Sequence, residues 1–196
     1  MKSWFLALFV VPFVLNGQDI TAALRKNIPG QFSVEERGDG AFVADYKRGD
    51  LNVQMTFLGK PQVGQDRITY IYRPPLVQMS FMVLPKEEVR SELQAKVILN
   101  SVKTEYEKIN LPIKEIKEVD KKNETIGGKR GDSFQYIIDL ENGIREFLTV
   151  KVVANGDFDV IPFTRVILSP SEAQDVDMRV KGNSTAANFF QTLQIR

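Results

Sequence analysis

The chain has 196 residues, with 26 basic and 25 acidic side chains, and it contains neither histidine nor cysteine. These two absences exclude nucleophile pairs that depend on histidine, and they exclude the usual zinc, copper and haem ligand sets. The balanced charge, without a basic stripe, argues against nucleic-acid binding. We therefore expect no nucleic-acid partner and no cofactor. Any catalysis would rest on carboxylates, lysine, tyrosine or serine, or on an oxygen-bound metal.

The first residues have the parts of a secretory signal peptide. Lys2 makes a basic start, residues 4–15 form an uncharged apolar run, and Gly17 closes the run with a small residue. The run is shorter than the roughly 20 apolar residues of a membrane span. The sequence therefore predicts a signal peptide over residues 1–17, with cleavage before Gln18 or alternatively after Ala23, and a periplasmic or secreted location.

Residues 18–196, the predicted mature chain, have the length of a single globular domain. Loss of Lys2 with the signal leaves equal numbers of basic and acidic side chains, so no overall charge attracts an anionic surface. We expect no membrane span in this part of the chain. Its composition leaves the oligomeric state open.

Alternating apolar and polar residues predict strands through the first half of the mature chain. The clearest is Leu51–Phe57, where every second residue is apolar. A short helix or turn is expected before the strands, over residues 19–27. The other predicted strands lie at residues 32–34, 41–46, 68–72 and 77–83.

One long helix is predicted between Pro85 and Pro112. Proline suits the first turn of a helix, and Glu87 and Glu88 suit the positive end of the helix dipole. Apolar residues at steps of three and four indicate a face that packs against a sheet. They are Val89, Leu93, Val97, Ile98, Val102, Tyr106 and Ile109.

The second half of the chain indicates an antiparallel meander followed by a short helix. Residues 113–122 are rich in lysine, which suits an edge strand because charge discourages pairing with other chains. Asn142-Gly143 and Asn155-Gly156 are strong hairpin signals, and Pro162 indicates an edge or a bulge. The remaining predicted elements are strands at 134–140, 144–153, 158–168 and 175–180, and a helix capped by Ser184 with Ala186, Phe189, Phe190 and Leu193 on its apolar face.

These elements predict an α+β fold in which one long and one short helix cover an antiparallel sheet, as in an α/β/α sandwich. Their order, the ending AANFFQTLQI at residues 186–195 and the stretch TIGG at residues 125–128 resemble the PsbP-like family. The resemblance implies an assembly or binding module without catalytic activity. It carries no functional residue over to this chain.

The tripeptide Arg-Gly-Asp occurs three times. On an exposed turn it presents a cation and a carboxylate on either side of a flexible glycine, as an adhesion ligand would. Turn chemistry is the simpler explanation, because glycine and aspartate both favour turns. The triplets are Arg37-Gly38-Asp39, Arg48-Gly49-Asp50 and Arg130-Gly131-Asp132, and the second and third are the candidate binding residues.

Carboxylates supply the other candidate sites. Asp157 and Asp159 follow an Asn-Gly turn and can offer oxygen ligands to calcium, although the full spacing of a calcium loop is absent. Asp139 and Glu141 would share one face of a strand, so they resemble the paired acids of a hydrolase. Adjacent acids also stand at Glu35 and Glu36.

The sequence as a whole favours an exported binding or assembly module that acts without catalysis. Its partner is expected to be a protein, or alternatively a small ligand held on a surface of the sheet. A carboxylate-dependent hydrolase and an adhesion protein that uses its Arg-Gly-Asp turns are the two other hypotheses.

Overall fold

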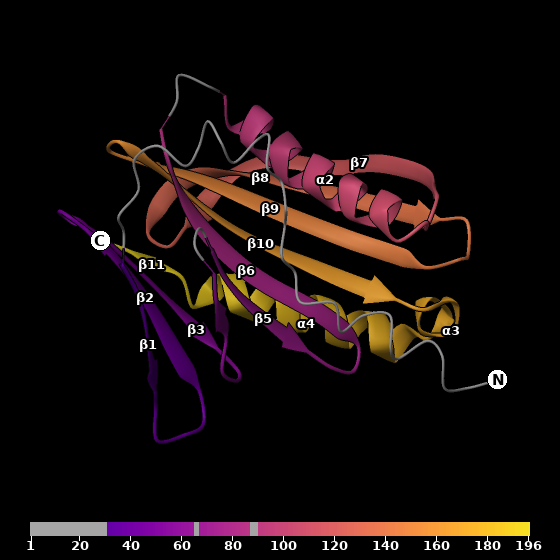
Figure 1. The fold of residues 1–196 in the computed structure, drawn as a ribbon, viewed down its shortest axis with the longest axis horizontal. Helices are drawn as coiled ribbons and strands as arrows, with labels where there is room; N and C mark the ends of the chain where they lie inside the picture. Colours follow the sequence, from indigo (N-terminus) through magenta and orange to yellow (C-terminus); the bar gives the residue numbers. More distant parts are fainter. Residues whose placement is uncertain (1–30, 65–66, 87–89) are drawn as a thin grey trace.

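The computed structural model describes residues 31–64, 67–86 and 90–196 and contains two antiparallel sheets (Figure 1). The predicted signal peptide and the predicted helix at 19–27 lie outside these residues. The smaller sheet has the order β1 (Gln31–Glu36), β2 (Phe42–Arg48), β3 (Leu51–Phe57), β11 (Gln194–Ile195). The larger sheet has the order β4 (Gln62–Val63), β5 (Arg67–Tyr72), β6 (Leu76–Pro85), β10 (Phe158–Leu168), β9 (Arg145–Asn155), β8 (Lys129–Leu140), β7 (Ile113–Ile126).

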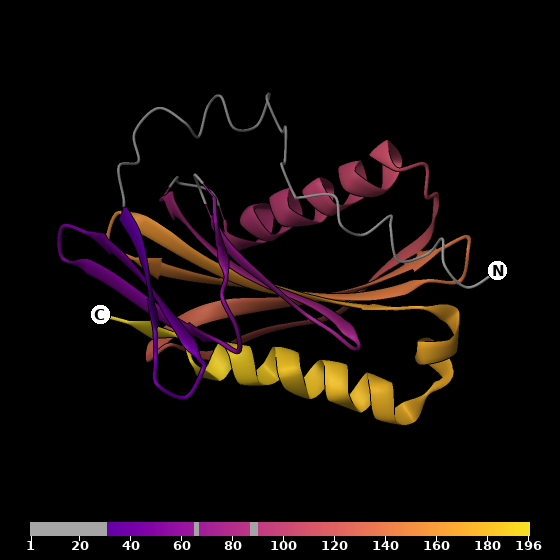
Figure 2. The same ribbon diagram turned by 60° about the horizontal axis from the view of Figure 1, so that its bottom comes forward.

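Two long helices cover opposite faces of the seven-stranded sheet (Figure 2). Helix α2 (Ser91–Lys108) packs on β9 and β8, whereas α4 (Val176–Gln191) packs on β10 and β6 and reaches β3. The short helix α3 (Pro170–Gln174) joins β10 to α4. The predicted α+β fold, an antiparallel sheet between helices, is confirmed, although the second helix is longer than expected.

Each helix encloses its own apolar core. One core lies between α2 and the large sheet and includes Ile98, Val102, Phe134 and Ile138. The other joins α4 to both sheets, and it contains Val53, Phe57, Phe81, Val166, Phe189 and Phe190. The second core explains why the small sheet and the C-terminal segment stay together, because their apolar faces are buried against the same helix.

Glycine allows the close contact between α4 and the large sheet. A Cβ atom on Gly182 would lie 2.6 Å from Cγ1 of Val166 on β10 and 3.1 Å from Cγ of Pro75. Real side chains do not approach so closely, so any larger residue would push α4 away from the sheet. The helix can therefore lie low over β10 at this point.

The start of the long helix differs from the prediction. Pro85 does not open a helix; it is the last residue of β6, opposite Phe158 on β10, and α2 begins at Ser91. Within the stripe, Ile98, Val102 and Tyr106 are buried as expected, but Leu93 is 50% exposed. The buried face of α2 instead passes through Gln94 and Ala95.

The expected strand at 175–180 is wrong, because these residues belong to α4. Oδ1 of Asp175 accepts hydrogen bonds from the backbone N–H groups of Asp177 and Met178, which caps the helix at its start. Ser184 is therefore an interior residue of α4 and not its cap. The apolar stripe expected farther along the helix, from Ala186 to Leu193, is buried as predicted.

Strand β10 lies in the middle of the sheet and pairs with β6 and β9 without a register shift, so the expectation that Pro162 marks an edge or a bulge is wrong. The ladder to β9 pauses at Ile161 and Pro162, where the missing proline N–H needs no acceptor. Both hairpin turns occur where expected. In each the glycine alone has positive φ, 82° at Gly143 and 60° at Gly156.

Residues 113–122 form the expected edge strand, since β7 ends the larger sheet. It extends farther than predicted, to Ile126, and contains register shifts between Ile113 and Glu115 and between Glu118 and Asp120. Among the described residues, no helix is both long enough and apolar enough to cross a membrane.

Candidate binding groove

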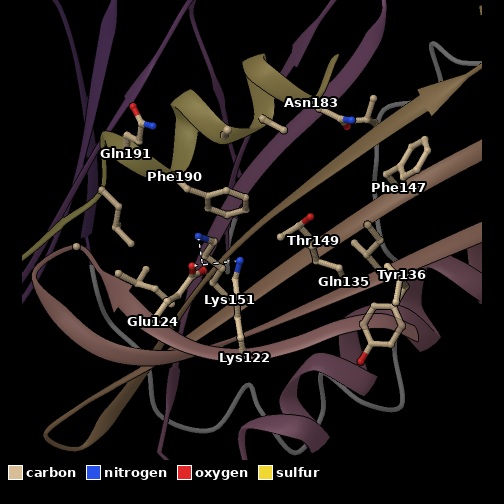
Figure 3. Close-up of a pocket in the computed structure, with 18 of the residues that line it drawn as sticks. Lys122, Glu124, Gln135, Tyr136, Phe147, Thr149, Lys151, Asn183, Phe190 and Gln191 are labelled. Carbon is tan, nitrogen blue, oxygen red and sulfur yellow. Dashed lines mark ion pairs between the residues drawn. The ribbon is translucent and has the colours of Figure 1, made fainter. Parts of the chain in front are cut away.

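A groove runs beside α4 on the face of the large sheet that α2 does not cover (Figure 3). Because α4 packs on β10 and β6, the side chains of β7, β8 and β9 on this face are left partly open. The groove has a volume of about 810 Å³, which lies within the range of ligand pockets.

The floor of the groove is built from cross-strand rows. Ile137 on β8, Phe147 on β9 and Val166 on β10 form an apolar row, with Phe147 paired to both neighbours. The next row is polar and pairs Gln135 with Thr149. Side chains that alternate along each strand point to opposite faces, so these rows follow directly from the register.

The wall of the groove is one face of α4. Asn183, Ala187 and Gln191 are exposed and line it at steps of four residues, with Phe190 buried beneath. Val176 and Val180 are 59% and 61% exposed, and their spacing continues this line toward the start of the helix. The result is a helix face with mixed apolar and amide side chains that is open to solvent beside an apolar strip of sheet.

An ion pair closes one end of the groove. Lys151 Nζ lies 2.6 Å from Oε1 of Glu124 and 4.5 Å from the ring centre of Phe190. Burial raises the pKa of Glu124, but the hydrogen bond and charge of Lys151 more than offset it, so the pKa lies below its ordinary value. Both charges are thus balanced within the protein, and Figure 3 shows them beside Phe190.

The opposite face of the same strands holds a buried cluster of charges beneath α2. Arg165 Nε lies 2.6 Å from Oε1 of Glu146, and its Nη1 lies 2.6 Å from Oε2 of Glu105. Tyr106 donates a hydrogen bond to Glu146, and burial followed by the charge of Glu146 raises the pKa of the tyrosine well above its ordinary value. This cluster is enclosed, with Arg165 2% exposed and Glu146 0% exposed.

The three Arg-Gly-Asp triplets lie in different settings. Arg37-Gly38-Asp39 is an exposed turn between β1 and β2, and Arg48-Gly49-Asp50 forms the next turn, as expected. However, the Arg48 guanidinium lies 4.6 Å from the ring centre of Phe158, so it packs against β10.

Arg130-Gly131-Asp132 is not a turn, which corrects the expectation that turn chemistry explains the third triplet. The residues belong to β8 and pair with Thr125, Glu124 and Asn123 of β7. A Cβ on Gly131 would lie 2.7 Å from the backbone oxygen of Val152, so the strand is held close against β9 at this position.

The two candidate metal ligands, Asp157 and Asp159, lie in different environments. Asp157 is exposed in the turn, whereas Asp159 is buried on β10 and accepts a hydrogen bond from Gln94 Nε2 at 3.3 Å. Among the described residues, no group of three or more acidic side chains is placed to hold a metal ion. Calcium binding by this pair stays a prediction.

The expected acid pair of Asp139 and Glu141 is not formed on one strand. Strand β8 ends at Leu140, so Glu141 lies in the following turn. Asp139 is paired with Arg145, with 2.6 Å between Oδ1 and Nε. Glu35 and Glu36 are exposed on β1.

The residues that line the groove were not predicted from the sequence. A signal for them exists in β8 and β9, where one alternating set of side chains is mostly large and apolar and the other mixes apolar with amide, hydroxyl and charged groups. The mixed set contains Gln135, Ile137, Phe147, Thr149 and Lys151.

No protein family model matches the chain, and no curated protein shows significant similarity to it. Solved structures with a similar arrangement include the Ran-binding protein Mog1p of Saccharomyces cerevisiae, with 12% identity, a TM-score of 0.45 and coverage of 84% of this chain and 95% of Mog1p. Cyanobacterial PsbP from Synechocystis sp. PCC 6803 has 9% identity, a TM-score of 0.44 and coverage of 87% and 95%. LpqN of Mycobacterium tuberculosis, which is involved in cell envelope biogenesis, has 14% identity, a TM-score of 0.36 and coverage of 90% and 96%.

A PsbP protein is thus among the structures similar to this chain, as the resemblance of the sequence led us to expect. The similarity lies in the arrangement of helices and strands, and it identifies no binding residue.

Proposed function

We propose that this protein is an exported binding module that holds an apolar segment of a partner protein in the groove beside α4. The observation that carries the proposal is the open strip of Ile137 and Phe147 next to the exposed face of α4 at Ala187. Covering apolar surface of this kind is the main favourable contribution to association. The signal peptide predicted over residues 1–17 supports a place of action outside the cytoplasm.

The polar groups of the groove favour a peptide over a charged small molecule. Lys151 pairs with Glu124, and Nζ of Lys122 lies 3.7 Å from Oε2 of Glu124 and 3.6 Å from Oδ2 of Asp120. Each charged group at that end of the groove therefore already has an opposite charge beside it. Gln135, Asn183 and Gln191 contribute side-chain amides. An amide can both donate and accept hydrogen bonds, which matches the N–H and C=O groups of a polypeptide backbone.

A pair of tryptophan substitutions tests this proposal. Ala187→Trp would fill the groove from its helical wall, while Asn188→Trp places the same side chain on the next exposed residue of α4, outside the groove lining. Peptides would be selected from a displayed random library on the purified protein and measured by isothermal titration calorimetry. We expect Ala187→Trp to weaken their binding at least about tenfold and Asn188→Trp to leave it unchanged.

The location of the bound peptide can be checked directly. The NMR chemical shifts of the Ile137 and Val166 methyl groups should change when peptide is added, because both side chains line the groove. Failure to select any peptide, or equal binding by the two tryptophan variants, would contradict the proposed function.

A further inference from the structure

The free edge of β7 is the longest strand edge in the described part of the chain. Strand β7 has 14 residues and pairs only with β8, whereas β4 at the other end of the sheet has 2. Its outer backbone groups can therefore accept another strand. An edge of this length is a template for pairing unless its side chains prevent it.

Charges of alternating sign follow this edge on the face that contains the groove. Glu115 and Lys117 precede the register shift, Asp120 and Lys122 follow it, and each lies opposite a residue of β8 that points to the groove side. Val119 stands at the shift and is 50% exposed. The order of signs is negative, positive, negative, positive.

We propose that β7 pairs antiparallel with β7 of a second copy of this chain, about a two-fold axis between Glu118 and Val119. In this register Glu115 lies opposite Lys122 of the second copy. Lys117 likewise lies opposite Asp120 of the second copy. The two-fold axis repeats both pairs, so Glu115, Lys117, Asp120 and Lys122 of each strand each face an opposite charge.

The irregularity at Val119 makes this register geometrically consistent. In a regular strand, two residues whose numbers differ by an odd number point to opposite faces. Because one extra residue stands between Glu118 and Asp120, Lys117 and Asp120 both point to the groove face. Residues before and after the shift can therefore meet on one face of a continuous sheet.

Two neighbouring registers would keep these side chains on the same face of the sheet, but both are disfavoured by repulsion between like charges. Moving the strands by two positions in one direction sets Glu115 opposite Glu124 and Lys117 opposite Lys122. Moving them the other way sets Glu115 opposite Asp120. Like charges that face each other across strands are destabilising, so the charge pattern selects one register and discourages unrelated strands.

The pairing has consequences for the rest of the molecule. In this register Val119 lies opposite Glu118 of the second copy, next to the axis, so the second strand covers part of the exposed valine side chain. An axis perpendicular to the sheet keeps the same face of both copies together. The two grooves would then lie on one side of a continuous sheet.

Complementary charge reversals test the register. Glu115→Lys and Lys122→Glu would each place like charges opposite each other in a homodimer. When the two variants are mixed, both altered pairs again join opposite charges. By analytical ultracentrifugation at low salt, we expect the original protein and the mixture to form dimers, and each variant alone to dimerise at least about tenfold more weakly.

Matched controls are available on the small sheet. Glu35→Lys on β1 and Lys47→Glu on β2 make the same charge changes at exposed positions away from β7, and they should leave dimerisation unchanged. Circular dichroism would confirm that each variant is folded. A protein that remains monomeric, a Lys122→Glu variant that dimerises normally, or a mixture that is not restored would each overturn the proposal.

Discussion

On the two faces of the large sheet, neighbouring residues of one strand differ in burial in an unexpected direction. On β9, Glu146 points toward α2 and is fully buried, while the next residue, Phe147, points into the groove and is only partly buried. A charged residue is thus enclosed and an aromatic one is left partly open. The usual ranking of residues by burial would predict the reverse.

The difference arises from where each helix crosses the sheet. Helix α2 lies over β9 and β8 and excludes solvent from Glu146, whose charge is balanced by Arg165. Helix α4 lies over β10 and β6, so the other side of β9 and β8 is not covered. Removing one partner of the enclosed ion pair would therefore destabilise the fold, whereas the uncovered apolar groups are available for binding.

Removing the buried cation should have the largest effect. Arg165→Met leaves the enclosed carboxylate of Glu146 without its bidentate partner, and breaking such a pair costs about 3–5 kcal/mol. Urea unfolding would measure the change. Arg145→Met is the control, because its pair with Asp139 is exposed to solvent and should contribute about 1 kcal/mol or less. Equal losses would show that the two faces do not differ in this respect.

Substitution of two adjacent isoleucines of β8 allows the contribution to core packing to be measured separately from the contribution to peptide binding. Ile138 is 0% exposed beneath α2, so Ile138→Ala should lower the free energy of unfolding by about 2–5 kcal/mol. Ile137→Ala, on the groove side, should cost only roughly 1 kcal/mol but should weaken the selected peptides. Unfolding curves and calorimetry together would test this, and peptide binding that survives Ile137→Ala would place the peptide elsewhere.

The smallest expected effect is a pH dependence of opposite sign on the two faces. Burial raises the pKa of Glu105 above 4.5 despite Arg165, so its contribution to stability is present below that pH and is lost as the pH rises through the raised pKa. The lowered pKa of Glu124 has the opposite consequence, since its contribution is present above 4.5 and is lost as the pH falls.

Melting temperatures of two variants between about pH 3 and 7 would measure these contributions. The melting temperature of the wild-type protein minus that of Glu105→Gln should fall as the pH rises. The melting temperature of the wild-type protein minus that of Glu124→Gln should rise over the same pH interval. Slopes of the same sign would contradict the contrast between the faces.

Much of the fold could be predicted from local patterns. Leu51–Phe57 was located to the residue because its alternation over seven positions is unambiguous. The strand at 158–168 was also located to the residue, because it is an apolar run that follows the Asn155-Gly156 turn. The segment around Val176 and Val180 was misread because the two valines also fit a helix, where residues four apart share a face. The cap at Asp175 and the packing of α4 on the sheet decide between the two structures.

The groove and the buried cluster were not predictable in the same way. Arg165 stands in an otherwise apolar stretch, which signals an unusual environment but does not name Glu146, 19 residues away, as its partner. The groove depends on the position of α4 relative to β9, and these elements are far apart along the chain. Neither relation is contained in a local pattern.

The sequence by itself determined the class of fold, the alternation that sends neighbouring side chains to opposite faces, and the exclusion of chemistry that needs histidine or cysteine. Only the tertiary structure decided which face is covered and which stays open. The reason is physical: alternation follows from the geometry of one strand, whereas coverage depends on how two distant helices pack against the finished sheet.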